Sequence, residues 1–326
     1  MADIRKSGEL TLLALMPCGL KVPFGKALSA FLEDLKVREG LSITYAVEGN
    51  LNQELSYYPY VETIEALEEL PDIIVSADFN VFYQHHFYRR FVEPGHLVGY
   101  GQVAPCPAFA EAGLNDSRGE YFLFGVNPLV LVVDLDRIGD RPLPGLWADI
   151  LDPVWKNDVI LRGNDDFYCH AVLLPLFQEG GEEALLRLAG NVRAGMHPAQ
   201  MVKQIDSGQG GALYVMPEFF AHRVKRKERI AIIWPRDGAL ASPVTLQVKR
   251  NRVAELKPVL DWLTGSELAR TLVGARFPVP NAEVEGDLQQ LPLKWLGWDW
   301  LRNNDLRRVN AEIDRIFLPA VAGRPA

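Results

Sequence analysis

Cysteine is scarce in this sequence of 326 residues, and no hydrophobic run is long enough to cross a membrane. The cysteines Cys18, Cys106 and Cys169 share no short spacing, which excludes a disulfide framework. They suit a reducing compartment, or a secreted protein that does not depend on bridges. The longest uncharged apolar stretch, 121–133, has 13 residues, whereas a helical span needs about 20. We therefore expect no direct insertion into a membrane.

Basic charge is also in short supply. Lysine and arginine number 34 against 42 acidic residues, so the formal net charge is −8. A nucleic-acid-binding protein usually carries a basic surface, and we expect no nucleic acid as a partner. The densest basic run, 223–229, has five basic residues among seven and is read as a solvated loop.

Motifs for catalysis are missing. The sequence has no G-x-S-x-G elbow, no Walker lysine and no G-x-G-x-x-G between a strand and a helix. The segment 208–211 is glycine-rich but precedes a strand, which is the wrong context for binding phosphate. The sequence therefore predicts a protein that is not an enzyme.

Apolar runs alternate with helical patterns, which is typical of an α/β protein. The patterns predict strands at 10–17, 42–47, 72–76, 129–133, 159–161, 212–216, 230–234 and 244–248. They predict one helix that begins near residue 23. Further helices are predicted at 63–70, 147–151, 167–178, 182–193, 198–206, 253–263, 266–275 and 305–317. The first three strands with their intervening helices favour parallel pairing and right-handed crossovers.

The length exceeds one typical core, so we expect two lobes. Their order along the chain is a first lobe, a second lobe and a return to the first. We place lobe 1 at 1–124 plus 240–326 and lobe 2 at 125–239, with hinge crossings near 120–128 and 234–243.

Three segments, taken in order, resemble a known family. The first segment resembles the first lobe of a type II periplasmic solute-binding protein. It consists of Gly8-Glu-Leu-Thr-Leu, a helix, a second strand and then Asp72-Ile-Ile-Val-Ser-Ala-Asp. The stronger match is Asn127-Pro-Leu-Val-Leu-Val-Val followed by Gly145-Leu-Trp-Ala-Asp-Ile-Leu, where that family crosses to its second lobe. Trp234–Ala241 and the strand after it resemble the return crossing. The similarity covers most of 8–280.

The resemblance implies a two-lobed periplasmic-binding-protein-like fold, each lobe a mainly parallel sheet flanked by helices. It implies a protein that closes on a solute by hinge motion, as the substrate-binding component of an ABC transporter. Within the family the chain most resembles the ferric-iron and small-anion branch. Iron binders of that branch use adjacent tyrosines of the second lobe, whereas this chain has isolated Tyr168 and Tyr214 there and Tyr57-Tyr58 in the first lobe.

Loops at the carboxyl ends of first-lobe strands supply the first candidate ligand contacts. Cys18 and Lys21 lie between the first strand and its helix, where Lys21 and exposed backbone N–H groups would favour an anion. Ser76, Asp78 and Asn80 follow the third strand. For these, hydrogen bonding to a polar ligand and capping of the next helix are both open.

The second lobe supplies Asn164, His197 and Asp237. Asn164 follows a strand and His197 precedes a helix, while Asp237 lies on the return crossing. Asn164 lies in the segment 162–166, whose acidic residues Asp165 and Asp166 serve equally well as helix caps. We predict that Cys18, Lys21, Ser76, Asp78 and His197 converge on one interlobe cleft, with Asp237 close by.

No cofactor is required by any motif, and no Cys-x-x-Cys or His-x-x-x-His pair indicates a structural zinc site. If a metal ion is bound, the candidate ligands are Cys18, His170, His197 and Asp237, which combine soft and borderline donors. The expected partners are a small polar or anionic ligand and an ABC-transporter permease.

The compartment depends on the first residues. Arg5 and Lys6 precede an apolar run, yet 17–23 is no small-residue cleavage site. The expectation is a cytoplasmic protein for the chain as given, or a periplasmic one if a signal peptide was removed. Two alternatives remain open: a cytoplasmic ligand sensor, and an enzyme that uses Cys18 or His197. Ligand identity and oligomeric state are open as well.

Overall fold

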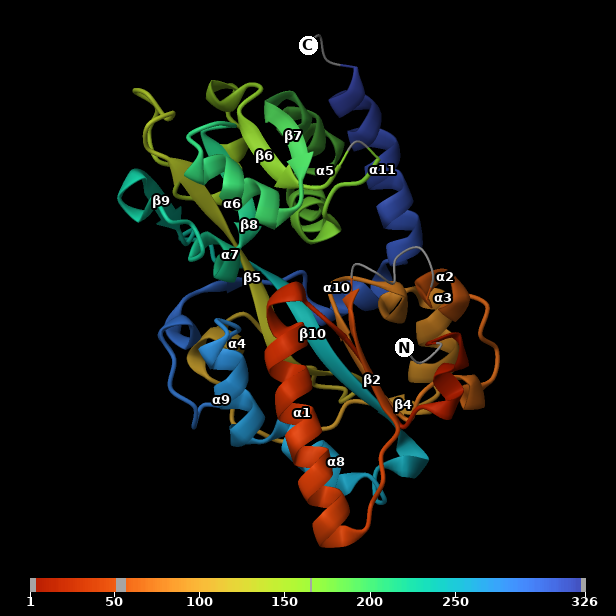
Figure 1. Ribbon diagram of the computed structural model, residues 1–326. Helices are drawn as coiled ribbons and strands as arrows, with labels where there is room; N and C mark the ends of the chain where they lie inside the picture. Colours follow the sequence, from red (N-terminus) through yellow and green to blue (C-terminus); the bar gives the residue numbers. More distant parts are fainter. Residues whose placement is uncertain (1–3, 51–56, 165, 324–326) are drawn as a thin grey trace. The chain divides into compact units, whose positions relative to one another are not determined.

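The computed structural model describes residues 4–50, 57–164 and 166–323 and divides the chain into two compact units (Figure 1). Unit 1 comprises 1–127, 242–290 and 297–306, and unit 2 comprises 128–241, 291–296 and 307–326. Among the described residues, no helix is long and apolar enough to span a membrane. The predicted α/β class is confirmed, because mainly parallel strands are flanked by helices in both units.

Unit 1 is built on three parallel strands in the order β2-β1-β3, followed by the antiparallel strand β10. β1 and β3 are buried at every position, as strands covered on both faces should be. The strands of this unit are β1 (Leu12–Met16), β2 (Tyr45–Gly49), β3 (Ile73–Ala77), β4 (Leu97–Val98) and the parts of β5 (Phe122–Asp134) and β10 (Ala239–Lys249) that belong to it.

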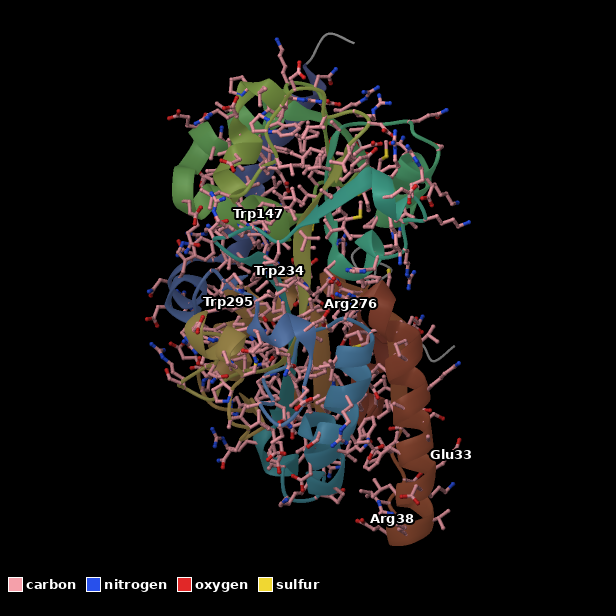
Figure 2. All side chains as sticks on the ribbon, turned by 90° about the vertical axis from the view of Figure 1, so that its left-hand side faces the viewer. Glu33, Arg38, Trp147, Trp234, Arg276 and Trp295 are labelled. Carbon is pink, nitrogen blue, oxygen red and sulfur yellow. The ribbon has the colours of Figure 1, made fainter. Side chains whose placement is uncertain are left out.

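Helix α1 (Cys18–Glu39) covers one face of this sheet and lies beside α9 (Figure 1). Its buried residues recur at helical spacing, and Phe31 stacks on Trp262 of α8 with ring centroids 4.6 Å apart. Glu33 and Arg38 lie on the carboxyl-terminal half of α1, where Arg38 pairs with Asp34 (Figure 2). The other helical elements are η1 (Ile4–Glu9), α2 (Tyr57–Val61), η3 (Leu67–Glu69), η4 (Val81–Tyr83), α3 (His85–Phe87), η5 (Tyr88–Val92), α4 (Pro107–Glu111), η9 (Arg250–Arg252), α8 (Lys257–Thr264), α9 (Ser266–Gly274), η10 (Asp287–Gln290) and α10 (Trp298–Asn303).

Unit 2 has parallel strands in the order β8-β6-β7, and β5 pairs with β8 and β9 in the antiparallel sense. The strands are β6 (Val159–Arg162), β7 (Val192–Met196), β8 (Leu213–Pro217), β9 (Ile230–Ile233) and β11 (Leu293–Lys294). The helical elements are η6 (Trp147–Leu151), η7 (Pro153–Trp155), α5 (His170–Asn191), α6 (Pro198–Asp206), α7 (Glu218–Ala221), η8 (Lys227–Arg229) and α11 (Leu306–Ala322). Trp147, labelled in Figure 2, is fully buried, and its indole N–H donates to the Gly238 carbonyl at 2.8 Å.

The prediction of two helices that are separated at the glycine pair 180–181 is confirmed, because α5 consists of two helical segments that meet at Gly181, whose backbone is not helical and whose φ is 58°. One feature of unit 2 differs from the sequence prediction. The strand β7 occupies residues predicted as a helix end and a loop. It is a partly exposed edge strand, so its sequence has no continuous apolar run.

The chain passes from unit 1 to unit 2 after Asn127 and returns after Ala241. The prediction that the whole segment 240–326 belongs to lobe 1 is wrong at the tail. Residues 291–296 and 307–326 belong to unit 2, because β11 pairs with Ala239 and Leu240 and Phe317 of α11 packs on Tyr168. Hinge motion at the crossings stays a prediction.

Candidate functional site

The carboxyl ends of β1, β2 and β3 lie at the same edge of the unit 1 sheet, since these strands are parallel. Cys18 opens α1 at this edge and is exposed. Lys21 follows in the first turn of α1, and its Nζ lies 3.1 Å from Oε2 of Glu48 on β2. The Lys21 charge is therefore already paired with a carboxylate.

Ser76 and Asn80 form hydrogen bonds within unit 1. The Ser76 hydroxyl is buried 3.4 Å from the Thr245 hydroxyl, in the register where β3 pairs with β10. Asn80 caps η4, because its Oδ1 accepts from the Phe82 amide at 3.0 Å and its Nδ2 donates to the Ala77 carbonyl at 2.9 Å. Of the two roles left open for Asn80, the structure shows the cap.

Asp78 directly follows β3 and has a φ of 71°, a left-handed conformation that few residues other than glycine adopt. Its amide donates to the Pro243 carbonyl at 2.8 Å, and its Oδ1 accepts from the next amide, Phe79, at 3.0 Å. Such strain concentrates at functional positions. Among the first-lobe candidates, Asp78 is the one with a left-handed backbone conformation.

In unit 2 the parallel strands β6, β7 and β8 also end at one edge. Arg162 is the last residue of β6, His197 follows β7, and Glu218 follows β8. His197 caps α6, and its Nδ1 accepts from the Ala199 amide at 3.2 Å. A neutral imidazole that accepts at Nδ1 carries its proton on Nε2, so His197 keeps a hydrogen-bond donor for another group.

The charge of Arg162 acts on the His197 ring. Partial burial and then the nearby Arg162 guanidinium lower the pKa of His197 from its ordinary value, because both disfavour the charged imidazolium. Arg162 also donates from its guanidinium to Cys169 Sγ at 3.5 Å. A permanent cation and a neutral N–H donor thus share this edge of the sheet.

Aromatic side chains lie beside this pair. The Phe220 ring packs edge-on to His197 with centroids 5.9 Å apart, and Phe219 lies 4.4 Å from Phe220. The Arg223 guanidinium lies over both rings, at 5.3 Å from Phe219 and 5.1 Å from Phe220. One side of the His197 ring is thus covered by Phe220, and a second guanidinium, that of Arg223, lies nearby over the same aromatic pair.

The other two unit 2 candidates are engaged within the unit. The Asn164 Oδ1 accepts from the Asp166 amide at 2.9 Å, and Asp165 lies outside the described residues. Asp237 pairs with Lys294 at 2.9 Å and accepts from the Trp147 amide at 3.3 Å. Trp234 and Trp295, labelled in Figure 2, belong to the same unit, and the Trp234 indole donates to the Pro292 carbonyl at 2.6 Å.

A metal centre is not visible in the described part of the chain, where no three His, Cys, Asp or Glu residues are grouped to hold an ion. Of the candidate ligands, His170 bonds to Asp314 at 3.0 Å through Nε2, and Asp237 is paired with Lys294. The set of Cys18, His170, His197 and Asp237 draws on both units and stays a prediction. So does the convergence of Cys18, Lys21, Ser76 and Asp78 with His197.

Both tyrosines of unit 2 are buried. The hydroxyl of Tyr214 donates to the Gln209 carbonyl at 3.2 Å, and burial raises the pKa of Tyr214 to about 12. The ring of Tyr168 packs against Phe317 at 5.2 Å. For Tyr214, burial thus favours the neutral phenol over the phenolate that would bind a ferric ion.

Sequence reasoning nominated the segment 162–166 but selected Asn164 from it and not Arg162, and it missed the segment Glu218–Phe220. The strand ends were the available signal. The sequence prediction stopped β6 at Leu161 and β8 at Met216, each one residue short of the structure, and the residues after β8 received no role.

Comparison with known proteins identifies the class to which this geometry belongs. A sequence model of the bacterial extracellular solute-binding proteins matches residues 68–304. No curated protein matches the sequence. The chain therefore belongs to the bacterial extracellular solute-binding protein family, because the matched residues make up well over half of its length.

Solved structures share the fold at low sequence identity. A Bordetella ferric binding protein is similar with a TM-score of 0.63 and 16% identity, covering 95% of this chain and 99% of that one. A Trichodesmium protein (IdiA, FutA) in complex with iron and citrate gives 0.64 and 12%, covering 95% and 98%. The periplasmic binding protein AfuA from Actinobacillus pleuropneumoniae, with fructose-6-phosphate bound, gives 0.61 and 13%, covering 94% and 98%.

These likenesses confirm the predicted two-lobed periplasmic-binding-protein fold. The predicted function is confirmed at the level of the class: this is a solute-binding protein of the kind that serves ABC-type uptake systems. Its family is one of binding proteins rather than of enzymes.

Proposed function

We propose that this protein binds a small anionic solute, held at the carboxyl edge of the unit 2 strands by Arg162 and His197. The observation that carries the proposal is that a permanent cation, Arg162, lies opposite Met196 in the sheet register, directly beside His197, whose Nδ1 is occupied by the Ala199 amide. Both groups then offer hydrogen-bond donors. Donors of this kind suit a phosphate or carboxylate, and guanidinium binds either one through two hydrogen bonds.

The charge balance of the site supports an anion over a free ferric ion. Ferric iron needs anionic oxygen ligands, but the unit 2 tyrosines are buried and Glu218 pairs with His222 at 2.7 Å. The neighbouring AfuA structure holds a sugar phosphate and the Trichodesmium structure holds iron with citrate. Both of those ligands include an anion, phosphate or citrate, and an anion is what Arg162 and His197 would bind here.

The remaining candidates belong to the same proposal. Asp78 in unit 1 and Asp237 in unit 2 would take the polar or cationic remainder of the solute, and Cys18, Lys21, Ser76, Asn80 and Asn164 are proposed as further contacts. The protein acts outside the cytoplasm and delivers its solute to an ABC-transporter permease, without catalysing a reaction. The family's extracellular character supports this placement.

Isothermal titration calorimetry tests the proposal with a fixed panel of inorganic phosphate, a hexose phosphate, citrate and ferric citrate. We expect at least one of these anions to bind the parent protein. Arg162→Gln should weaken that binding about thirtyfold, since losing a charged hydrogen-bond partner costs about 2 kcal/mol. His197→Gln should weaken it as well. Arg187→Gln, an exposed arginine on α5, is the matched control and should bind like the parent.

A further inference from the structure

The C-terminal helix α11 packs against the residues that follow Arg162. On α11, Asp314 accepts a hydrogen bond from His170 Nε2 at 3.0 Å, and the fully buried Phe317 meets the Tyr168 ring at 5.2 Å with the planes nearly perpendicular. Tyr168 and His170 flank Cys169 in the sequence. Two separate contacts from one helix therefore fix the residues on either side of Cys169.

Cys169 is in turn bonded to Arg162 in two ways. Its amide donates to the Arg162 carbonyl at 2.9 Å, and its sulfur accepts from the Arg162 guanidinium at 3.5 Å. An isolated bridge between Gly163 and Tyr168 closes the same turn. A continuous series of contacts thus leads from Asp314 and Phe317, through Tyr168 and His170, to Cys169 and the guanidinium of Arg162.

We propose that α11 is a positioning element for the anion site, with Phe317 and Asp314 as positioning residues that hold the Arg162 guanidinium through the turn that contains Cys169. The inference rests on the proposed function, because Arg162 must be the anion-binding cation. A preorganised guanidinium binds an anion more tightly, since less side-chain freedom is lost on binding. The family model matches only as far as residue 304, so this role is carried by residues outside the matched segment.

The three cysteines provide a readout that needs no ligand. Cys169 is only 2% exposed and Cys106 1%, whereas Cys18 is exposed. Replacing Cys18 by serine leaves two buried thiols, one in each unit. Alkylation with iodoacetamide, followed by mass spectrometry of the peptides, then measures the opening of each site separately.

In the Cys18→Ser background, Phe317→Ala should label Cys169 about tenfold faster or more and leave the Cys106 rate unchanged. Phe317→Ala in the protein that retains Cys18 should bind the anion that the parent binds about tenfold more weakly than the parent does. Phe317→Leu fills most of the same volume and should restore both values. Asp314→Asn should show a smaller change in the same direction. Glu312→Ala, on the exposed face of α11, should match the parent.

The outcomes separate the two proposals. If the parent binds none of the anions in the panel, the proposed function fails and the role of α11 fails with it. If the parent binds and Arg162→Gln weakens binding, but Phe317→Ala keeps the parent affinity or the parent protection of Cys169, only the positioning role is overturned. A denaturant midpoint for Phe317→Ala confirms that the folded protein is being measured.

Discussion

The amide of Asp78 donates to the Pro243 carbonyl at 2.8 Å, and it does so with Asp78 in the left-handed conformation, at a φ of 71°. This hydrogen bond ties the end of β3 to the neighbouring part of β10 within unit 1. A residue with a Cβ atom is strained in this conformation by about 1 to 2 kcal/mol. The conformation therefore costs stability, and the local hydrogen bond from the Phe79 amide to Asp78 Oδ1 offsets part of that cost.

A pair of variants measures that strain. Asp78→Gly relieves the steric conflict at Cβ, while Asp78→Ala keeps it, and both remove the carboxylate. We expect the glycine variant to have the higher free energy of unfolding, by about 1 kcal/mol, in urea denaturation. If Asp78 contacts the solute as proposed, both variants should lose affinity alike. Equal stabilities of the two variants would contradict the assignment of strain.

Arg302 of α10 is the centre of a buried ion network in unit 1. Its guanidinium pairs with the fully buried Asp116 and with Glu120 at 2.7 Å, and its own side chain is 7% exposed. Burial disfavours the charged form, but the hydrogen bonds to Asp116 and Glu120 outweigh it and raise the pKa of Arg302. The network fastens α10 to the segment before β5.

Arg302→Met should lower the free energy of unfolding by about 3 to 5 kcal/mol, because it leaves two carboxylates without their cation. Urea denaturation followed by circular dichroism gives the value. Asp299→Ala is the matched control on the same helix, since Asp299 is 89% exposed, and it should change stability little. A loss below about 1 kcal/mol for Arg302→Met would show that the network is not stabilising.

The His197 ring predicts a pH dependence of stability. Burial and the Arg162 charge lower the pKa of His197 in the folded protein, so the unfolded chain binds a proton more readily as pH falls through about 6.5. The contribution of His197 to stability is present above that pH and is lost below it. We expect His197→Gln to lose less free energy of unfolding than the parent between pH 7.5 and pH 5.

The quantity to compare is the slope of the free energy of unfolding against pH. The substitution also changes the cap of α6 and hence the stability at every pH, so absolute values are not compared. His86→Gln, an exposed histidine of unit 1, serves as the control and should keep the parent slope. A parent and a His197→Gln variant with identical slopes would argue against the shifted pKa.

The strands were predictable because burial on both faces leaves a continuous apolar run. The runs at 10–17 and 72–76 became β1 and β3. The edge strand β7 was not predictable in this way, since it is partly exposed and contains Gly195. For α11, the predicted stripe of Leu306, Val309, Ile313 and Ile316 indicated a buried face, and all of these except Val309, which is half-buried, are buried. An amphipathic pattern does not say which sheet covers it, so the unit was predicted wrongly.

The candidate site was predictable only in part, for a related reason. The rule that ligands meet the carboxyl ends of parallel strands selected His197 and Asp78 correctly as residues at such ends. It could not separate a cap from a ligand contact at Asn80, because both roles use the same polar atoms. Arg162 lay in the nominated segment 162–166, but the sequence alone did not show which of its polar residues is placed beside His197.

The central claim is that Arg162 provides the cation for an anionic solute, and calorimetric titration of Arg162→Gln beside the parent tests it most directly. The account predicts that an anion of the panel binds the parent and that its dissociation constant rises about thirtyfold in the variant, with Arg187→Gln unchanged. An Arg162→Gln protein that is folded and binds the same anion with the parent's dissociation constant would contradict the account.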